Sequence, residues 1–565
     1  MSAGLITSTT SAAGSAGSIN ISTSGSVTAD ADSEVSTTAE EGSSGSAGSI
    51  VVTAADDVNI FNTSEITSNA AGSGGTGSIT INATSLFIDG VRAEDSDATA
   101  NQGNALLLGD ETTESPEATE ETDEPEPRTG IFSESTGAGD EAKPGGEIEI
   151  NLADTLDLRN TGEISSNATG DTNLAGSINI FTDTMSIDGT ATNEDGTNGS
   201  GITATSAFNG ATGSGGDITI QGVRQDEPGA TAPATAVLLQ NGANISASSS
   251  GSGQAGEITV NALLIDLDNS TINNENSSND VSAPGSSAGG RITLGHFQLD
   301  ENGEPLRDEN GEPVLVDDTM IIVQNGSQVS TSSIIGNSGD VTLGADTLMI
   351  KRGLILSSTS EGSAAAGNIT LNSDVLALDQ AFVQANANGG TGGLIEVNTT
   401  ITQSSGGVNV GGDPVDPPPN FNDGDVISSS VIQAASASGV TGEVRLSSPV
   451  FDVNAVVNDL DSDFIDITDL AIDPCAAFVE GAPSSLTTPG NGGLPLVGSI
   501  LGTTDVTTEL LDILDDFTES APVDNTKKKI DRGFLFVPAD GDSQGQSVFS
   551  LADTDAIGHD CEGAY

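Results

Sequence analysis

One short phrase occurs three times between Gly339 and Val397: Gly339-Asp-Val-Thr-Leu343, Gly367-Asn-Ile-Thr-Leu371 and Gly393-Leu-Ile-Glu-Val397. Each copy is a glycine and a usually polar residue, followed by an aliphatic, a polar and an aliphatic residue. Alternation with a period of two places both aliphatic side chains on one face of a strand. The glycine suits a corner where the backbone turns sharply. The phrase therefore predicts a short strand that follows a glycine corner.

The phrase recurs along most of the chain. Nine further copies start at Gly17, Gly48, Gly77, Gly146, Gly176, Gly216, Gly256, Gly290 and Gly442, and in only one of them does an aliphatic residue, Val51, fill the polar position. Chance would give on the order of three matches in a chain of this composition, so the excess indicates a true repeat. The base unit is 26 to 31 residues, and longer intervals indicate insertions.

Two further short strands are predicted inside each unit. The second follows the anchor phrase, as in Val58-Asn-Ile60, Leu86-Phe-Ile88, Leu156-Asp-Leu158, Met185-Ser-Ile187 and Leu376-Ala-Leu378. The third resembles Glu65-Ile-Thr-Ser68, Glu163-Ile-Ser-Ser166, Asn244-Ile-Ser-Ala247 and Gln328-Val-Ser-Thr331. Three short strands with polar corners cannot close a core alone, but stacked copies bury their aliphatic faces against one another.

These features predict an all-β fold. We expect a right-handed parallel β-helix of about twelve coils, with loop insertions and an irregular C-terminal tail, because parallel connections are right-handed by default. Twelve coils at about 4.8 Å each would form a rod roughly 55–60 Å long. The predicted boundaries are 1–455 for the repeats, with insertions at 91–143, 296–318 and 404–424, then 456–498 for an acidic linker and a motif, and 499–565 for the tail.

The insertions have their own composition. Asp110 to Pro127 holds nine acidic residues and no basic ones, which is typical of a solvated loop, with a cation-binding loop as the alternative. Asp300-Glu-Asn-Gly-Glu-Pro305 is repeated as Asp308-Glu-Asn-Gly-Glu-Pro313. Asn-Gly is a strong turn signal, so we expect two tight turns in a strand-rich arm. A calcium loop would need a longer ligand series than these segments contain.

The net charge of −69 comes from 83 acidic and 14 basic residues. Nucleic acid is excluded as a partner because phosphate binding requires clustered lysine and arginine. Docking on anionic membranes is disfavoured for the same reason. The charge keeps an exposed rod soluble, and it also suits saline surroundings where salt screens self-repulsion. No stretch of about 18 apolar residues is present, so no transmembrane segment is predicted.

Catalytic signatures are missing from the sequence. Enzymes with β-helix folds that act on acidic polysaccharides use acid clusters together with arginine or lysine, and cations are scarce in this chain. His296 and His559 stand alone, and no pattern typical of a nucleophilic triad or a zinc protease is present. We therefore predict no enzyme activity, no cofactor and no metal site. The alternative is a polysaccharide lyase or hydrolase, which an acid–base cluster on coils 216–294 would favour.

A distinctive motif follows the repeats. It consists of Cys475, Ser484-Ser485-Leu486 and Gly490-Asn491-Gly492-Gly493-Leu494-Pro495. The motif and the upstream repeat together resemble cyanobacterial filamentous-haemagglutinin-like proteins over roughly residues 10 to 498. Leu486 stands where that family usually has phenylalanine, and Asn491 where it usually has arginine.

The resemblance implies a β-helical protein secreted through an outer-membrane transporter of the two-partner type. It implies a location outside the cell or on its surface, and a role in adhesion, aggregation or the matrix, with surface glycans or other cells as partners. The family's N-terminal secretion domain is not matched, and no signal peptide is visible near Met1. We therefore expect the C-terminal part of a longer protein or a mis-called start, and a non-exported fragment is the alternative.

Cys475 and Cys561 are the only cysteines. They would be able to pair in an oxidising compartment, and two unpaired thiols are the alternative. In some related adhesins a C-terminal cysteine pair helps to tether the protein, which is a weak parallel to this pair.

Overall fold

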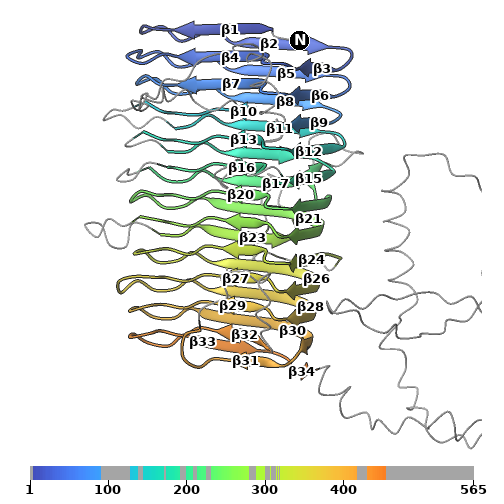
Figure 1. The fold of residues 1–565 in the computed structure, drawn as a ribbon, viewed down its shortest axis with the longest axis vertical. Coiled ribbons are helices and arrows are strands. Elements are labelled where there is room, and N and C mark those ends of the chain that lie inside the picture. The colour runs from blue at the N-terminus through green and yellow to red at the C-terminus, as the bar shows by residue number, and fades with distance from the viewer. Residues whose placement is uncertain are drawn as a thin grey trace, which may run out of the picture. The chain divides into compact units, whose positions relative to one another are not determined.

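The computed structural model describes residues 4–90, 128–137, 144–170, 174–190, 199–207, 213–223, 231–278, 288–298, 306, 314, 316, 318–415 and 429–452. In these ranges every regular element is a strand, and neighbouring strands pair almost entirely in parallel. Figure 1 shows the coils stacked in chain order from β1 and β2 to β33 and β34. The predicted all-β, parallel β-helix fold is confirmed.

The twelve anchor phrases form the first row of strands, and we number the coils after them. The row consists of β2 (Ile19–Thr23), β5 (Ile50–Ala54), β8 (Ile79–Ala83), β11 (Ile148–Leu152), β14 (Ile178–Phe181), β17 (Ile218–Val223), β21 (Glu257–Asp268), β23 (Arg291–Gly295), β26 (Val341–Lys351), β28 (Ile369–Asp379), β30 (Leu394–Ser405) and β33 (Glu443–Leu446). Each strand pairs in parallel with the next along the row. One unbroken ladder therefore crosses every insertion.

The second row continues each coil. It consists of β3 (Val27–Ala29), β6 (Val58–Phe61), β9 (Leu86–Asp89), β12 (Thr155–Arg159), β15 (Thr184–Asp188), β19 (Ala234–Gln240), β24 (Met320–Gln324), β34 (Val450–Asp452) and the C-terminal halves of β21, β26, β28 and β30. In those four long strands the first and second rows merge. A short strand, β18 (Thr231–Ala232), pairs antiparallel with the end of β17.

The third row forms a separate sheet, which we call the third sheet. It consists of β1 (Leu5–Thr10), β4 (Glu34–Ala39), β7 (Glu65–Ala70), β10 (Thr129–Phe132), β13 (Gly162–Ser165), β16 (Gly201–Thr203), β20 (Asn244–Ser246), β22 (Thr271–Asn273), β25 (Gln328–Ser330), β27 (Leu354–Leu356), β29 (Phe382–Gln384) and β32 (Ser430–Gln433), with β31 (Val408–Val410) beside β32 at its end. The four third-strand segments predicted from the sequence all belong to this row.

Two predicted insertions are too long. Residues 129–132 form β10, which pairs with β7 and β13, so the coil resumes well before the predicted end of the 91–143 insertion. Likewise, Ser404 and Ser405 complete β30, and β31 lies inside the predicted 404–424 insertion. The glycine-anchored phrase identifies only the first strand of a coil, so it gave no signal at these third strands. The acidic run at 110–127 lies outside the described residues.

The 296–318 insertion is described at a few positions only. Gln298 N–H donates to Val314 O (2.8 Å), Leu306 N–H to Gln298 O (2.6 Å), and Val314 N–H to Leu306 O (2.7 Å). These three residues are eight positions apart, the spacing of the repeated Asp-Glu-Asn-Gly-Glu-Pro segments, and their hydrogen bonds close a ring. The two predicted turns themselves lie outside the described residues.

The core is a set of aliphatic columns along the stack. The first aliphatic residue of each anchor phrase aligns with its counterparts in neighbouring coils, from Ile19 to Val444. In this column the side chains from Ile50 to Ile395 are completely buried. The aliphatic columns of the second and third rows are also buried, as Leu156 and Ile164 of coil 4 show. Burial of such a side chain stabilises the fold by roughly 1.5–3 kcal/mol.

The anchor glycines form a column of their own. A Cβ atom placed on any of the eleven from Gly48 to Gly442 would lie closer than 3.0 Å to the carbonyl oxygen of the anchor glycine one coil earlier. None of the twelve has a left-handed backbone. The requirement for glycine is therefore a close approach between coils, and not the sharp corner expected from the sequence.

We predict that Gly339→Ala lowers the free energy of unfolding by about 2 kcal/mol or more, because the methyl group would collide with the carbonyl of Gly290. Gly14→Ala is the matched control, since a Cβ there meets nothing within 4 Å. Urea denaturation followed by circular dichroism measures both. Equal midpoints for the two variants would contradict the glycine-column explanation.

Candidate functional site

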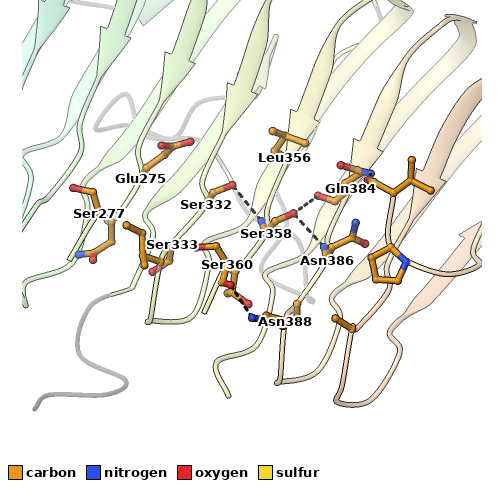
Figure 2. Close-up of a pocket in the computed structure, with 17 residues that line it drawn as sticks. Glu275, Ser277, Ser332, Ser333, Leu356, Ser358, Ser360, Gln384, Asn386 and Asn388 are labelled. Atoms are coloured by element: carbon orange, nitrogen blue, oxygen red, sulfur yellow. Dashed lines mark hydrogen bonds between the residues drawn. The ribbon is translucent and has the colours of Figure 1, made fainter. Parts of the chain in front are cut away.

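The outward face of the third sheet is rich in hydroxyl and amide groups. In each third strand the aliphatic residue points into the core, so the residues on either side of it face outward. Over coils 7 to 11 these outward residues line a groove with a volume of about 530 Å³. Figure 2 shows the side chains of Ser332, Ser358 and Asn386 side by side along it. Two other concavities on the described residues have volumes of about 400 and 420 Å³.

Hydrogen bonds between coils fix the groove's lining. Ser358 N–H donates to Ser332 Oγ (3.3 Å), and Asn386 N–H donates to Ser358 Oγ (3.2 Å). Asn388 Nδ2 donates to the carbonyl of Ser360 (3.0 Å). These bonds appear as dashed lines in Figure 2. The polar groups follow the ends of the third strands, and hydrogen bonds between neighbouring coils hold them in place.

One carboxyl group, Glu275, lies at the coil 7 end of the groove. Its Oε1 accepts hydrogen bonds from Ser330 Oγ and, at 3.4 Å, from Gln328 Nε2. Burial raises the pKa of Glu275, and the hydrogen bond from Ser330 opposes that rise only in part. The opposite end is formed by Pro414 and Val415.

The lining limits what the groove can do chemically. It offers hydroxyls, amides and one carboxyl group, and no lysine, arginine or histidine lines it. Hydrolysis of a glycosidic bond by acid–base catalysis requires two carboxyl groups. The arrangement suits binding of a polar chain by hydrogen bonds.

A second feature of the third sheet is an ion-pair cluster around Arg128 in coils 2 to 5. Its guanidinium donates to both oxygens of Glu134 (2.7 and 2.9 Å) and to Glu163 Oε2 (3.0 and 3.3 Å). The guanidinium carbon also lies 3.8 Å from the centre of the Phe132 ring. All three nitrogens are engaged, so this arginine is part of a closed cluster rather than a clamp for an acidic sugar.

Gly130 lies between two glutamates of the cluster. Strand register places Glu65, Gly130 and Glu163 in one outward row, and a Cβ atom at Gly130 would collide with the carbonyl oxygen of Glu163. Burial raises the pKa of Glu163, against the effect of Arg128. Burial also raises the pKa of Glu65, and the neighbouring charge of Glu34 adds to that rise.

An acid–base cluster on coils 216–294 would have favoured the enzyme alternative. In that range the described residues include one cationic side chain, Arg291, which aligns with Glu257 of the neighbouring strand. The Arg128 cluster lies elsewhere on the solenoid. Among the described residues, no three His, Cys, Asp or Glu side chains lie where they would hold a metal ion together.

The residues of the predicted tail motif, Cys475, Ser484, Ser485, Gly490, Gly492, Gly493, Leu494 and Pro495, lie outside the described residues, as do Cys561 and His559. His296 is described, and its Nδ1 lies 2.6 Å from Asp318 Oδ1. Over the part of the chain that the structure describes, no helix is long and apolar enough to cross a membrane.

Sequence reasoning missed both the groove and the Arg128 cluster. The signal for the groove was the recurring serine or asparagine two residues after the end of a third strand, namely Ser332, Ser358 and Asn386. Comparison with protein-family models, with curated proteins and with solved structures finds no match.

We predict that Glu65→Gln raises the melting temperature at pH 8 and has little effect near pH 4. A raised carboxyl pKa means that the stabilising contribution is complete below the unfolded pKa of about 4.5 and is lost as the pH rises through the folded value. The amide removes a charge that the fold disfavours at pH 8, where it also relieves repulsion with Glu34. Calorimetry at both pH values measures this. Glu40→Gln, at an exposed site after the same sheet's β4, is the control, and equal shifts for both variants would contradict the prediction.

Proposed function

We propose that this chain is a secreted or cell-surface structural protein of the filamentous-haemagglutinin type that mediates adhesion or aggregation. The observation that supports this most is the third-sheet groove, a row of hydroxyl and amide groups carried across five coils of a stacked solenoid. The resemblance of the repeat and of the motif at 475–495 adds to it. The proposed partners are surface glycans or other cells, and an outer-membrane transporter for export.

The charge of the chain fits such a role. A net charge of −69 opposes close packing of two copies at low ionic strength, and salt screens this repulsion over about 10 Å at 0.1 M. Short-range hydrogen bonds to the side of the solenoid are screened much less. Adhesion would therefore strengthen as ionic strength rises, in contrast to binding by opposite charges.

The two alternatives have less support. A polysaccharide-active enzyme requires a second carboxyl group beside Glu275, and the groove lining holds one. A non-exported fragment predicts the same fold but a different location, so the location of the native protein separates it from the proposed function.

We expect an antibody against residues 499–565 to detect the native protein in the medium or on intact cells, in a band larger than the 56.2 kDa of this chain. The fractions are medium, cell surface and cytosol, with a cytosolic enzyme as the marker for lysis. Detection of a 56 kDa band in the cytosol alone would contradict the proposal and support the non-exported fragment.

A further inference from the structure

The outward face of the third sheet becomes apolar in coils 9 to 11. Leu354, Phe382 and Val431 occupy equivalent outward positions in three neighbouring strands, where earlier coils have residues such as Glu163 and Gln328. Their exposed fractions are 9%, 1% and 5%. Residues on the outer face of a sheet become buried only where other parts of the chain cover them.

A five-residue segment, Gly411–Val415, lies against Gln384 and Gln433 at the ends of β29 and β32, and we call it the strap. It leaves β31 at Gly411 and Gly412, whose φ angles of 73° and 92° are left-handed. That conformation favours glycine, so the turn is built into the sequence. The strap then runs to Pro414 and Val415, which form the coil 11 end of the groove.

Two stacked glutamines bind the backbone of the strap. Gln433 Nε2 donates to the carbonyls of Gly411 and Asp413, and Gln433 Oε1 accepts from Val415 N–H (3.0 Å). Gln384 Nε2 donates to the carbonyl of Val415 (2.6 Å). These glutamines align in adjacent strands and are almost fully buried. The sheet therefore already binds backbone N–H and carbonyl groups here, through donors and an acceptor on buried amides.

The groove continues from the end of the strap. Along the row that contains Gln433 and Gln384, the next outward residues are Leu356 and Ser330, and the parallel row offers Asn386, Ser358 and Ser332. From coil 11 to coil 7 there are four steps of about 4.8 Å, which together match roughly six residues of extended chain. Glu275 lies at the far end.

We propose that the groove is a docking site for an extended, proline-containing peptide of a partner protein, with a lysine or arginine that reaches Glu275. An extended or polyproline chain makes no internal hydrogen bonds, so its backbone groups are available to hydroxyls and amides of the kind that line the groove. The carboxylate of Glu275 and the net charge of the chain favour a cationic peptide. The proposal rests on the adhesive role proposed above and names a peptide, rather than a glycan, as the ligand of the same groove; it does not depend on export.

The test is fluorescence anisotropy of a fluorescein-labelled synthetic peptide, Pro-Val-Ser-Pro-Ser-Pro-Ser-Lys amide, titrated with the purified full chain. We expect saturable binding, about tenfold weaker when glutamate replaces the peptide's lysine. Glu275→Gln should weaken binding of the lysine peptide to a similar extent, because it removes one charge-assisted hydrogen bond.

Ser277→Lys gives an independent variant, since Ser277 is an exposed residue of the groove's rim and its new charge would repel the peptide's lysine without disturbing packing. Glu149→Gln, on a first-row strand, is the control and should leave binding unchanged. Melting curves establish that each variant is folded. Absence of saturable binding would overturn the proposal, as would binding by the Glu275 and Ser277 variants as tight as binding by the unchanged chain. Displacement of the peptide by a neutral β-linked glucose hexasaccharide would also overturn it, by assigning the groove to glycans.

Discussion

Successive coils of this solenoid approach one another closely along the column of anchor glycines, where a Cβ atom added to any of the eleven from Gly48 to Gly442 would collide with the carbonyl oxygen of the glycine one coil earlier. This contact fixes both the distance and the register between coils. A slip of one residue would turn the aliphatic columns outward, because side chains alternate along a strand. Buried hydroxyls from the third row complete the corner: Ser68 donates to Gly48 O (3.0 Å) and Ser133 to Gly77 O (2.9 Å). The hydrophobic core, the satisfied backbone and the flat outer faces all depend on this column.

In-register stacking creates an electrostatic problem for a chain with 83 acidic residues, because equivalent side chains lie one strand spacing apart. At the end of the second row the sequence avoids stacked carboxylates. From coil 3 to coil 10 no two aspartates are neighbours among the aligned residues, which are Asp89, Arg159, Asp188, Gln240, Asp268, Gln324, Lys351 and Asp379.

Asparagines in the following turns donate to the same aspartates, as Asn325 does to Asp268 (2.8 Å). Where two glutamates do align, as Glu34 and Glu65 do, the next position is a glycine. Hydrogen bonds to the aspartates and the separation of acidic residues between coils thus limit the repulsion between stacked carboxylates.

The repeat was predictable because the close approach of neighbouring coils requires a glycine at the anchor position of each coil. All twelve anchor phrases became strands of one ladder, and the second and third strands followed from alternation. Strands β10 and β31 were missed. Thr129-Gly-Ile-Phe132 has no anchor glycine and follows a long insertion, and Val408-Asn-Val410 lies beside the proline-rich segment, within the same predicted insertion. The groove could not be predicted from the sequence, because its lining residues are spread from position 275 to position 415 and come together only when the coils stack. Likewise, no motif marks Gln384 and Gln433 as partners of the strap.

The central claim is that one continuous ladder carries the chain through every insertion, with one strand of each row per coil. Pulsed electron paramagnetic resonance between spin labels at Asn20→Cys and Arg445→Cys, with Cys475 and Cys561 replaced by serine, tests it directly. These positions are aligned through eleven strand pairings, which at about 4.8 Å each gives roughly 53 Å. A narrow distribution near that distance is the predicted result. A broad distribution, or a distance below about 40 Å, would contradict the continuous stack.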